Sequence, residues 1–135
     1  MEQNYFIEQV NFASQIAIYK NGEETIFEKE SDEFETIKQS FEKMLNNYRE
    51  MPAFSVSLDE ETRKEKMHGL WIELIFNDTF THNEMPYTKL LIKVEKEFTG
   101  FNIIRYNNSY DGRCYYVDLS NDMEELFFAI EKTLN

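Results

Sequence analysis

The sequence predicts an α+β fold, in which an antiparallel sheet of an N-terminal hairpin and a three- to four-strand meander packs against two amphipathic helices. Three observations predict it: several short segments alternate apolar and polar residues, Asn-Gly separates two of them, and two other segments repeat apolar residues at helical spacing. At 135 residues the chain fits a single domain, 1–135, because domains typically run to about 100–150 residues.

Residues 15–20 (QIAIYK) and 23–28 (EETIFE) flank Asn21-Gly22. A two-residue type I′ turn needs positive φ at both central residues, and Asn-Gly supplies it. These segments are therefore expected to form a β-hairpin.

Residues 32–49 are expected to form a helix that ends before Met51-Pro52. Ser31 or Asp32 is suited to cap its first turn. The apolar residues of one stripe are Phe34, Ile37, Phe41, Met44, Leu45 and Tyr48.

The C-terminal segment 120–135 (SNDMEELFFAIEKTLN) predicts the second amphipathic helix, with Asn121 and Glu124 as a capping box. Phe128 falls on the side opposite its apolar face. The residues of that face are Met123, Leu126, Phe127, Ile130 and Leu134.

Residues 53–57 alternate weakly and predict a short strand. Residues 58–68 (LDEETRKEKMH) are highly charged. They are expected to form either a short exposed helix, capped by Ser57 and closed at Gly69, or an exposed loop.

Segments 70–77, 87–98, 101–106 and 113–119 predict further strands. The connections between them are too short for parallel crossovers, so these strands are expected to form an antiparallel meander.

The central strands are predicted to be apolar on both faces. Leu70, Ile72, Leu74 and Phe76 share the face expected to meet the helices. The other face would combine apolar, aromatic and charged residues: Trp71, Glu73, Ile75, Lys89, Leu91, Lys93, Ile104, Tyr106 and Tyr116. Such a face needs cover from the N-terminal hairpin, from Phe128 and its helix, or from another molecule.

The charge balance is strongly acidic, with 26 acidic against 14 basic residues and a net charge of −12. This field disfavours direct nucleic-acid binding and favours a basic protein partner. A net charge that only keeps the protein soluble is the alternative interpretation.

One cysteine excludes an internal disulfide, and neither a signal peptide nor an apolar run of membrane-spanning length is recognisable. A cytoplasmic protein without membrane contact is therefore expected. The composition is typical of proteins from AT-rich bacteria, because it is rich in Lys, Asn, Ile, Tyr and Glu.

The candidate binding residues are the aromatic residues of the mixed face and two nearby arginines. Tyr and Arg are favoured at protein interfaces because they bury area and still make polar contacts. The predicted set is Trp71, Tyr106, Tyr116, Arg105 and Arg113. The alternative is a tyrosine-rich hairpin whose rings pack across strands.

Catalytic and metal-binding signals are sparse. His68, Asp78, His82 and Glu84 are a weak alternative metal site, because their spacing matches no established motif. Cys114 lies in a predicted strand, where it is expected to act as a small hydrophobe unless a histidine activates it. No Gly-rich phosphate loop is present, and no cofactor is predicted.

The leading functional hypothesis is a non-enzymatic protein-binding module. One form is an immunity-type inhibitor that masks a basic toxin or nuclease. A rival form is a homodimer joined through the same face. The alternative class is a small metal-dependent or hydrolytic enzyme that uses the region of His68 and His82.

Overall fold

The computed structural model describes residues 5–46, 48–82 and 84–135, and the side chains of residues 52–55 lie outside this description. The elements along the chain are α1 (Tyr5–Phe12), β1 (Gln15–Lys20), β2 (Glu23–Glu28), α2 (Asp32–Met44), β3 (Arg49–Ser57), α3 (Asp59–Glu65), β4 (Leu70–His82), β5 (Met85–Val94), β6 (Gly100–Tyr106), β7 (Gly112–Asp118) and α4 (Glu124–Leu134).

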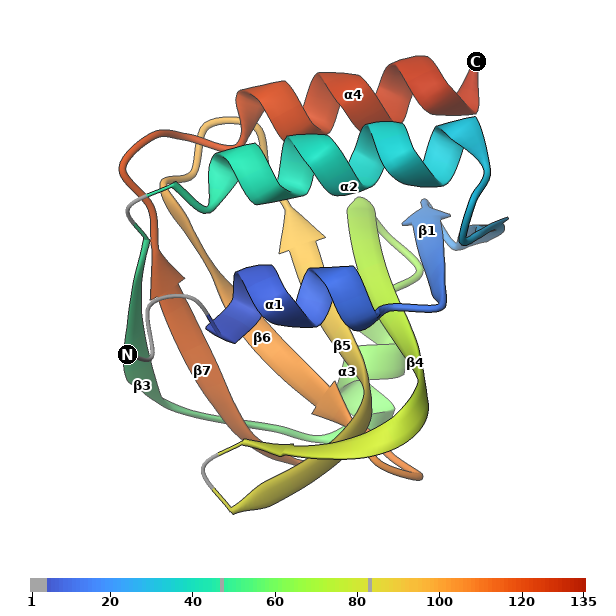
Figure 1. The fold of residues 1–135 in the computed structure, drawn as a ribbon. Helices are drawn as coiled ribbons and strands as arrows, with labels where there is room; N and C mark the ends of the chain where they lie inside the picture. Colours follow the sequence, from blue (N-terminus) through green and yellow to red (C-terminus); the bar gives the residue numbers. More distant parts are fainter. Residues whose placement is uncertain (1–4, 47, 83) are drawn as a thin grey trace.

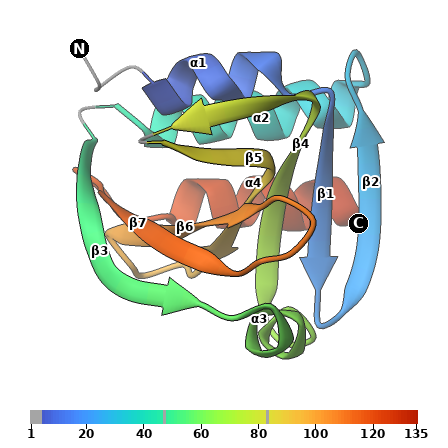
Figure 2. The same cartoon turned by 90° about the horizontal axis from the view of Figure 1, so that it is seen from below.

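The described strands form one antiparallel sheet in the order β2-β1-β4-β5-β6-β7-β3. The predicted hairpin is confirmed, because β1 pairs with β2 across Asn21 and Gly22, both at positive φ. The predicted meander is confirmed as β4 to β7. β3 pairs with β7 and curves along that edge of the sheet (Figure 2).

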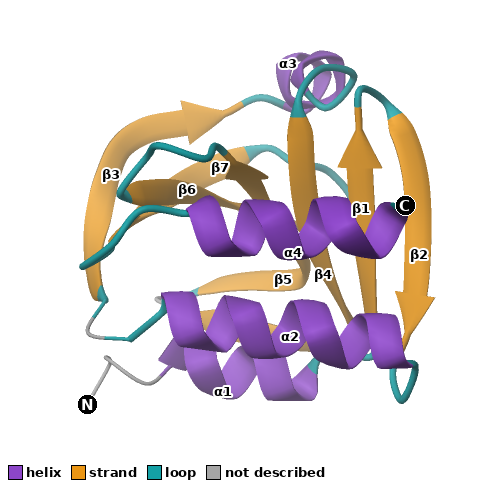
Figure 3. Cartoon of the chain, turned by 90° about the horizontal axis from the view of Figure 1, so that it is seen from above, coloured by secondary structure: helices purple, strands orange, loops and turns teal. Residues whose placement is uncertain are grey.

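Three helices, α1, α2 and α4, cover one face of the sheet, and α2 and α4 lie side by side (Figures 1 and 3). Between these layers lies the main apolar core, which includes Ile72 and Leu74 of β4 and Ile92 of β5. The predicted α+β class is therefore confirmed. Both predicted amphipathic helices, α2 and α4, pack on the sheet as expected, and α1 is a third helix that the sequence did not predict.

The helix α1 was missed because its eight residues are too few for a clear pattern and too few to be stable alone in water. Packing supplies the stability, since Phe6 and Val10 are buried in the core. Its backbone is also tied down: the Phe6 amide donates to the Tyr48 hydroxyl at 3.1 Å.

The helix α2 begins as predicted, with Ser31 as its N-cap accepting from the Phe34 amide at 3.1 Å. It ends at Met44 and not at residue 49. The reason is tertiary: the chain turns at Leu45 and runs back from Arg49 as strand β3.

The predicted capping box of α4 is wrong. Met123 occupies the N-cap without a side-chain cap, and Asp122 instead accepts from the Glu124 amide at 3.2 Å. The predicted cap residue Asn121 lies before the N-cap Met123 and is not the cap. Phe128 is exposed, as its place opposite the apolar face predicted.

Several strand limits differ from the predicted ones. β4 extends to His82, with a register shift between Ile75 and Phe80, and β3 is longer than 53–57. β5 ends at Val94 and not at residue 98. Pairing with a neighbouring strand determines where each of these strands begins and ends. The polar residues at the strand ends give no sign of that pairing in the sequence.

Residues 59–65 form the helix α3, so the helical alternative for segment 58–68 is confirmed. Leu58 is its N-cap, whereas the predicted cap Ser57 donates its hydroxyl to the Tyr110 carbonyl. α3 lies on the face opposite the other helices (Figure 3). It therefore covers part of the mixed face, where the hairpin or the Phe128 helix was expected.

Candidate functional site

The face that carries α3 holds a second, smaller apolar cluster. Trp71 of β4 pairs with Tyr19 of β1 and Lys93 of β5, so the three share this face. The buried members of the cluster are Trp71, Leu91, Ile104, Tyr110 and Cys114, with Tyr19 and Tyr106 packed beside them. The predicted two-sided character of the central strands is confirmed.

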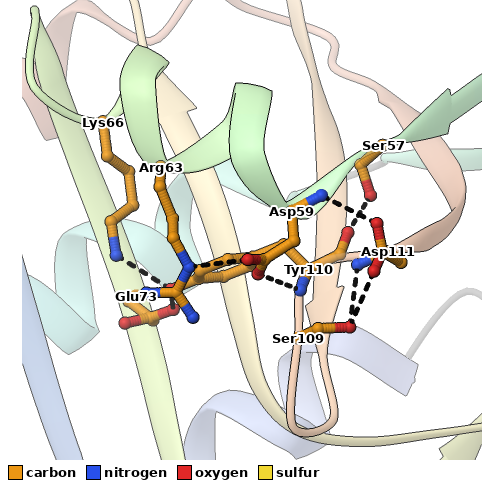
Figure 4. A network of polar contacts seen from close by, with 8 residues as sticks. All are labelled: Ser57, Asp59, Arg63, Lys66, Glu73, Ser109, Tyr110 and Asp111. Carbon is orange, nitrogen blue, oxygen red and sulfur yellow. Dashed lines mark hydrogen bonds and ion pairs between the residues drawn. The ribbon is translucent and has the colours of Figure 1, made fainter.

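A buried carboxylate lies at the edge of this cluster. Glu73 is 0% exposed, and the Tyr110 hydroxyl donates to it at 2.6 Å (Figure 4). The Tyr19 hydroxyl lies 3.1 Å from its other oxygen. The Lys66 ammonium donates to the Tyr110 hydroxyl at 2.9 Å and lies 4.2 Å from the centre of the Tyr19 ring. The buried charge is tolerated because donors and a nearby cation surround it.

The N-terminal end of α3 is hydrogen-bonded to the loop between β6 and β7 (Figure 4). Asp59 accepts from the Arg63 guanidinium at 2.8 Å and from the Tyr110 amide at 2.9 Å. The Asp59 amide in turn donates to Asp111 at 2.8 Å. These contacts bring together residues about fifty positions apart in the sequence, and they hold α3 against the sheet.

The protonation of this network suits a structural role. Burial raises the pKa of Tyr110 above its ordinary value, and the Glu73 carboxylate raises it further. Burial lowers the pKa of Lys66, whereas the charge of the nearby Glu73 carboxylate raises it and partly offsets this effect. The hydrogen bond from Arg63 lowers the pKa of Asp59. Tyr110 is 2% exposed and Glu73 0%, so these two groups bind each other and present no reactive atom to solvent.

A groove of about 450 Å³ opens on the same face, next to the end of α3. We call it the α3 groove. Trp71, Ile104 and Tyr116 line it from β4, β6 and β7, and Phe98 stands at its border with 55% of its surface exposed. Aromatic and aliphatic side chains in a concave site are typical of a binding surface.

The rim of the α3 groove is acidic. Glu65 ends α3, and Glu95 and Glu97 lie in the turn between β5 and β6. Lys93 is the one base among the described residues that line the groove. Three carboxylates and one ammonium give a local charge of −2, which favours a cationic ligand.

Gly100 sets the shape of the groove. A Cβ at this position would lie 2.7 Å from the Val117 carbonyl oxygen and would overlap the Tyr116 hydroxyl.

We expect Gly100→Ala to lower the free energy of unfolding by about 1–3 kcal/mol, because it overpacks the β6–β7 pair. Urea unfolding measures this change. Gly22→Ala is unsuitable as a control because its φ is positive; Thr99→Ala, at an exposed neighbour, should change little.

The structure places the three predicted aromatic residues on the α3 face. Trp71 is only 3% exposed and its indole N–H donates to the His68 carbonyl at 2.8 Å, so it is a wall of the groove more than a surface anchor. Tyr116 is half-buried at the groove. Tyr106 lies away from it, with the Lys89 ammonium over its ring at 4.8 Å.

The two predicted arginines do not join these aromatic residues. Arg105 pairs with Leu90, whose side chain belongs to the main core, and its guanidinium lies over the Tyr115 ring at 5.8 Å. It is 7% exposed. Arg113 is exposed and pairs with Val56 of β3. Alternation along β6 and β7 puts both arginines on the opposite face, so their inclusion in one binding surface was wrong.

The weak metal alternative is also not brought together. His68 precedes β4 and His82 is its last residue, so the length of the strand separates them. His82 instead lies 2.5 Å from Glu50 and stacks on Tyr5. Among the described residues, no three acidic, histidine or cysteine side chains gather as metal ligands.

Cys114 is buried in the second apolar cluster, in agreement with a hydrophobic role. His82 packs on Tyr115, on the other face of β7, and the His68 side chain is exposed. Neither histidine is therefore positioned by these contacts to activate the thiol.

Sequence reasoning missed Lys66, Tyr110 and Glu65 as parts of this face. One signal was available: Glu73 interrupts the apolar strand LWIELIF, and a charge there needs a partner once the strand is buried. The identity of the partners was not readable, because it depends on how α3 folds back over the sheet.

Comparison of the chain with protein-family models, with curated proteins and with solved structures finds no match in any of the three. Function is therefore inferred from the groove and its side chains. In the described part of the chain, no helix is long and apolar enough to cross a membrane.

Proposed function

We propose that this protein is a non-enzymatic binding module that docks a basic protein partner at the α3 groove. One observation carries the proposal: an aromatic groove with an acidic rim lies on the face of the sheet that α1, α2 and α4 leave open. A concave apolar site supplies buried contact area, and rim charges select a partner of the opposite sign.

The charge of the whole chain supports this choice. A net charge of −12 steers basic proteins toward the molecule and raises their association rate at low salt. An inhibitor that masks the basic surface of a toxin or nuclease is one form of the proposal. A second copy of the chain is a poorer occupant, because the acidic rims of two copies would repel each other.

The internal network favours binding over catalysis. The ionisable groups of Figure 4 are engaged with one another, and the buried Glu73 and Tyr110 are closed to a substrate. The groove beside them presents carboxylates at its rim, which suit recognition of a cation.

Photo-crosslinking in the source cells tests this proposal. A benzophenone side chain at Phe98 should crosslink a protein of basic isoelectric point. The same side chain at Phe12 provides the matched control, because Phe12 is equally exposed, at 57% against 55%, but lies on α1. It should not crosslink that protein.

The captured protein, once purified, should bind the chain with an affinity that falls as salt rises, and Glu65→Gln with Glu97→Gln should weaken binding. Equal capture from positions 12 and 98, capture of an acidic protein, or capture only of a second copy of this chain would each count against the proposal.

A further inference from the structure

We infer that the group of the partner that enters the α3 groove is an arginine side chain, whose guanidinium stacks on Trp71 and binds the rim carboxylates. This inference rests on the proposed function and names the chemistry that the groove selects.

The Trp71 ring already carries a cation from the chain itself. The Lys93 ammonium lies 5.7 Å from the ring centre, within the range of a cation–π contact. The indole N–H bond to the His68 carbonyl fixes the ring in place. Because Trp71 is only 3% exposed, a guanidinium can stack on the ring only after Lys93 is displaced from it. Tyr116, packed against Gly100, lines the groove beside it.

The rim provides acceptors from separate elements. Glu65 comes from α3, whereas Glu95 and Glu97 come from the β5–β6 turn, and none of the three has an ion pair among the described residues. A guanidinium is planar and has five N–H donors, so it can stack on a ring and reach carboxylates at the same time. A lysine ammonium is compact and strongly hydrated, and it uses such a site less well.

Lys93 follows from this geometry as a competitor for the incoming arginine. It is exposed, and its ammonium has no carboxylate partner among the described residues. An arginine that reaches Trp71 must displace it and overcome its repulsion. Removal of the Lys93 charge should therefore strengthen arginine binding, although it removes a residue that lines the site.

Trp71 is the only tryptophan of the chain, so its fluorescence reports occupancy of the groove. The probes are three short peptides of alternating glycine with arginine, lysine or citrulline. We expect the arginine peptide to change the fluorescence saturably, with a Kd at least about threefold lower than that of the lysine peptide. Citrulline keeps the planar group without the charge and should bind weakest.

Variants make the assignment specific. Lys93→Gln should lower the Kd of the arginine peptide by about threefold, whereas Lys29→Gln, at an exposed turn distant in sequence from the groove, should not. The double variant Glu65→Gln, Glu97→Gln should raise the Kd by about threefold or more, and the paired control Glu8→Gln, Glu33→Gln, with exposed carboxylates on α1 and α2, should not.

Equal affinity for arginine and lysine peptides would overturn the arginine assignment and leave the basic-partner proposal standing. No saturable fluorescence change with the arginine peptide would also overturn it. The crosslink from position 98 then decides the proposed function separately, because it needs no assumption about the entering side chain. An unchanged or raised Kd in Lys93→Gln would overturn the role given to Lys93.

Discussion

Replacing Glu73 by alanine should lower the free energy of unfolding by about 3–5 kcal/mol. The substitution removes the acceptor of the Tyr110 hydroxyl, which is itself buried, and a carboxylate that stabilises the charge of the half-buried Lys66. Unpaired buried donors and an uncompensated buried charge are among the few single-residue changes with effects of this size. Denaturant unfolding followed by circular dichroism measures it.

Two further variants separate the contributions. Glu73→Gln keeps an acceptor for Tyr110 and loses only the charge, so it should cost less than Glu73→Ala. Glu8→Ala, at an exposed carboxylate on α1, controls for loss of charge alone and should change stability by less than about 0.5 kcal/mol. If Glu73→Ala costs no more than this control, the buried network does not hold α3 to the sheet.

Raising the pH above about 10 should destabilise the protein steeply. Burial raises the pKa of Tyr19, Tyr87 and Tyr110 above the ordinary tyrosine value. In the unfolded chain all three hydroxyls lose their protons near pH 10, whereas the folded protein retains them, so unfolding releases protons. The stability due to these protons is present in full below about pH 10 and is lost as the pH rises toward the folded values.

Each retained proton contributes a slope of about 1.4 kcal/mol per pH unit, so the three tyrosines together give about 4 kcal/mol per pH unit. Lys66 contributes a slope of the opposite sign below about pH 10.5. Burial lowers its pKa, so the folded protein releases this proton at a lower pH than the unfolded chain does. Unfolding free energies measured by urea at a series of alkaline pH values give the slope.

The tyrosine-to-phenylalanine variants should each flatten this slope by about a third. Tyr87→Phe also loses the hydrogen bond to Gln9, so its stability at neutral pH will be lower, and the comparison must use slopes. A free energy of unfolding that stays constant between about pH 8 and pH 11 would refute the prediction.

The sequence by itself determined the local elements of this protein. Asn21-Gly22 determined the hairpin, because few residues adopt positive φ at both turn positions. The apolar stripe of α2 and the alternation in β4 determined which side chains form the core, because these periods follow from backbone geometry alone. The same alternation predicted that the central strands are apolar on both faces.

Only the tertiary structure decided what covers the second face and what the groove contains. α3 carries almost no apolar residues, so its place depends on Lys66 and Asp59 reaching Tyr110, which lies far along the chain. Strand pairing likewise put Arg105 on the opposite face from Trp71 and left His68 and His82 apart. Local patterns encode dihedral angles and burial, whereas strand order and long-range polar contacts arise only when distant segments compete to cover the same surface.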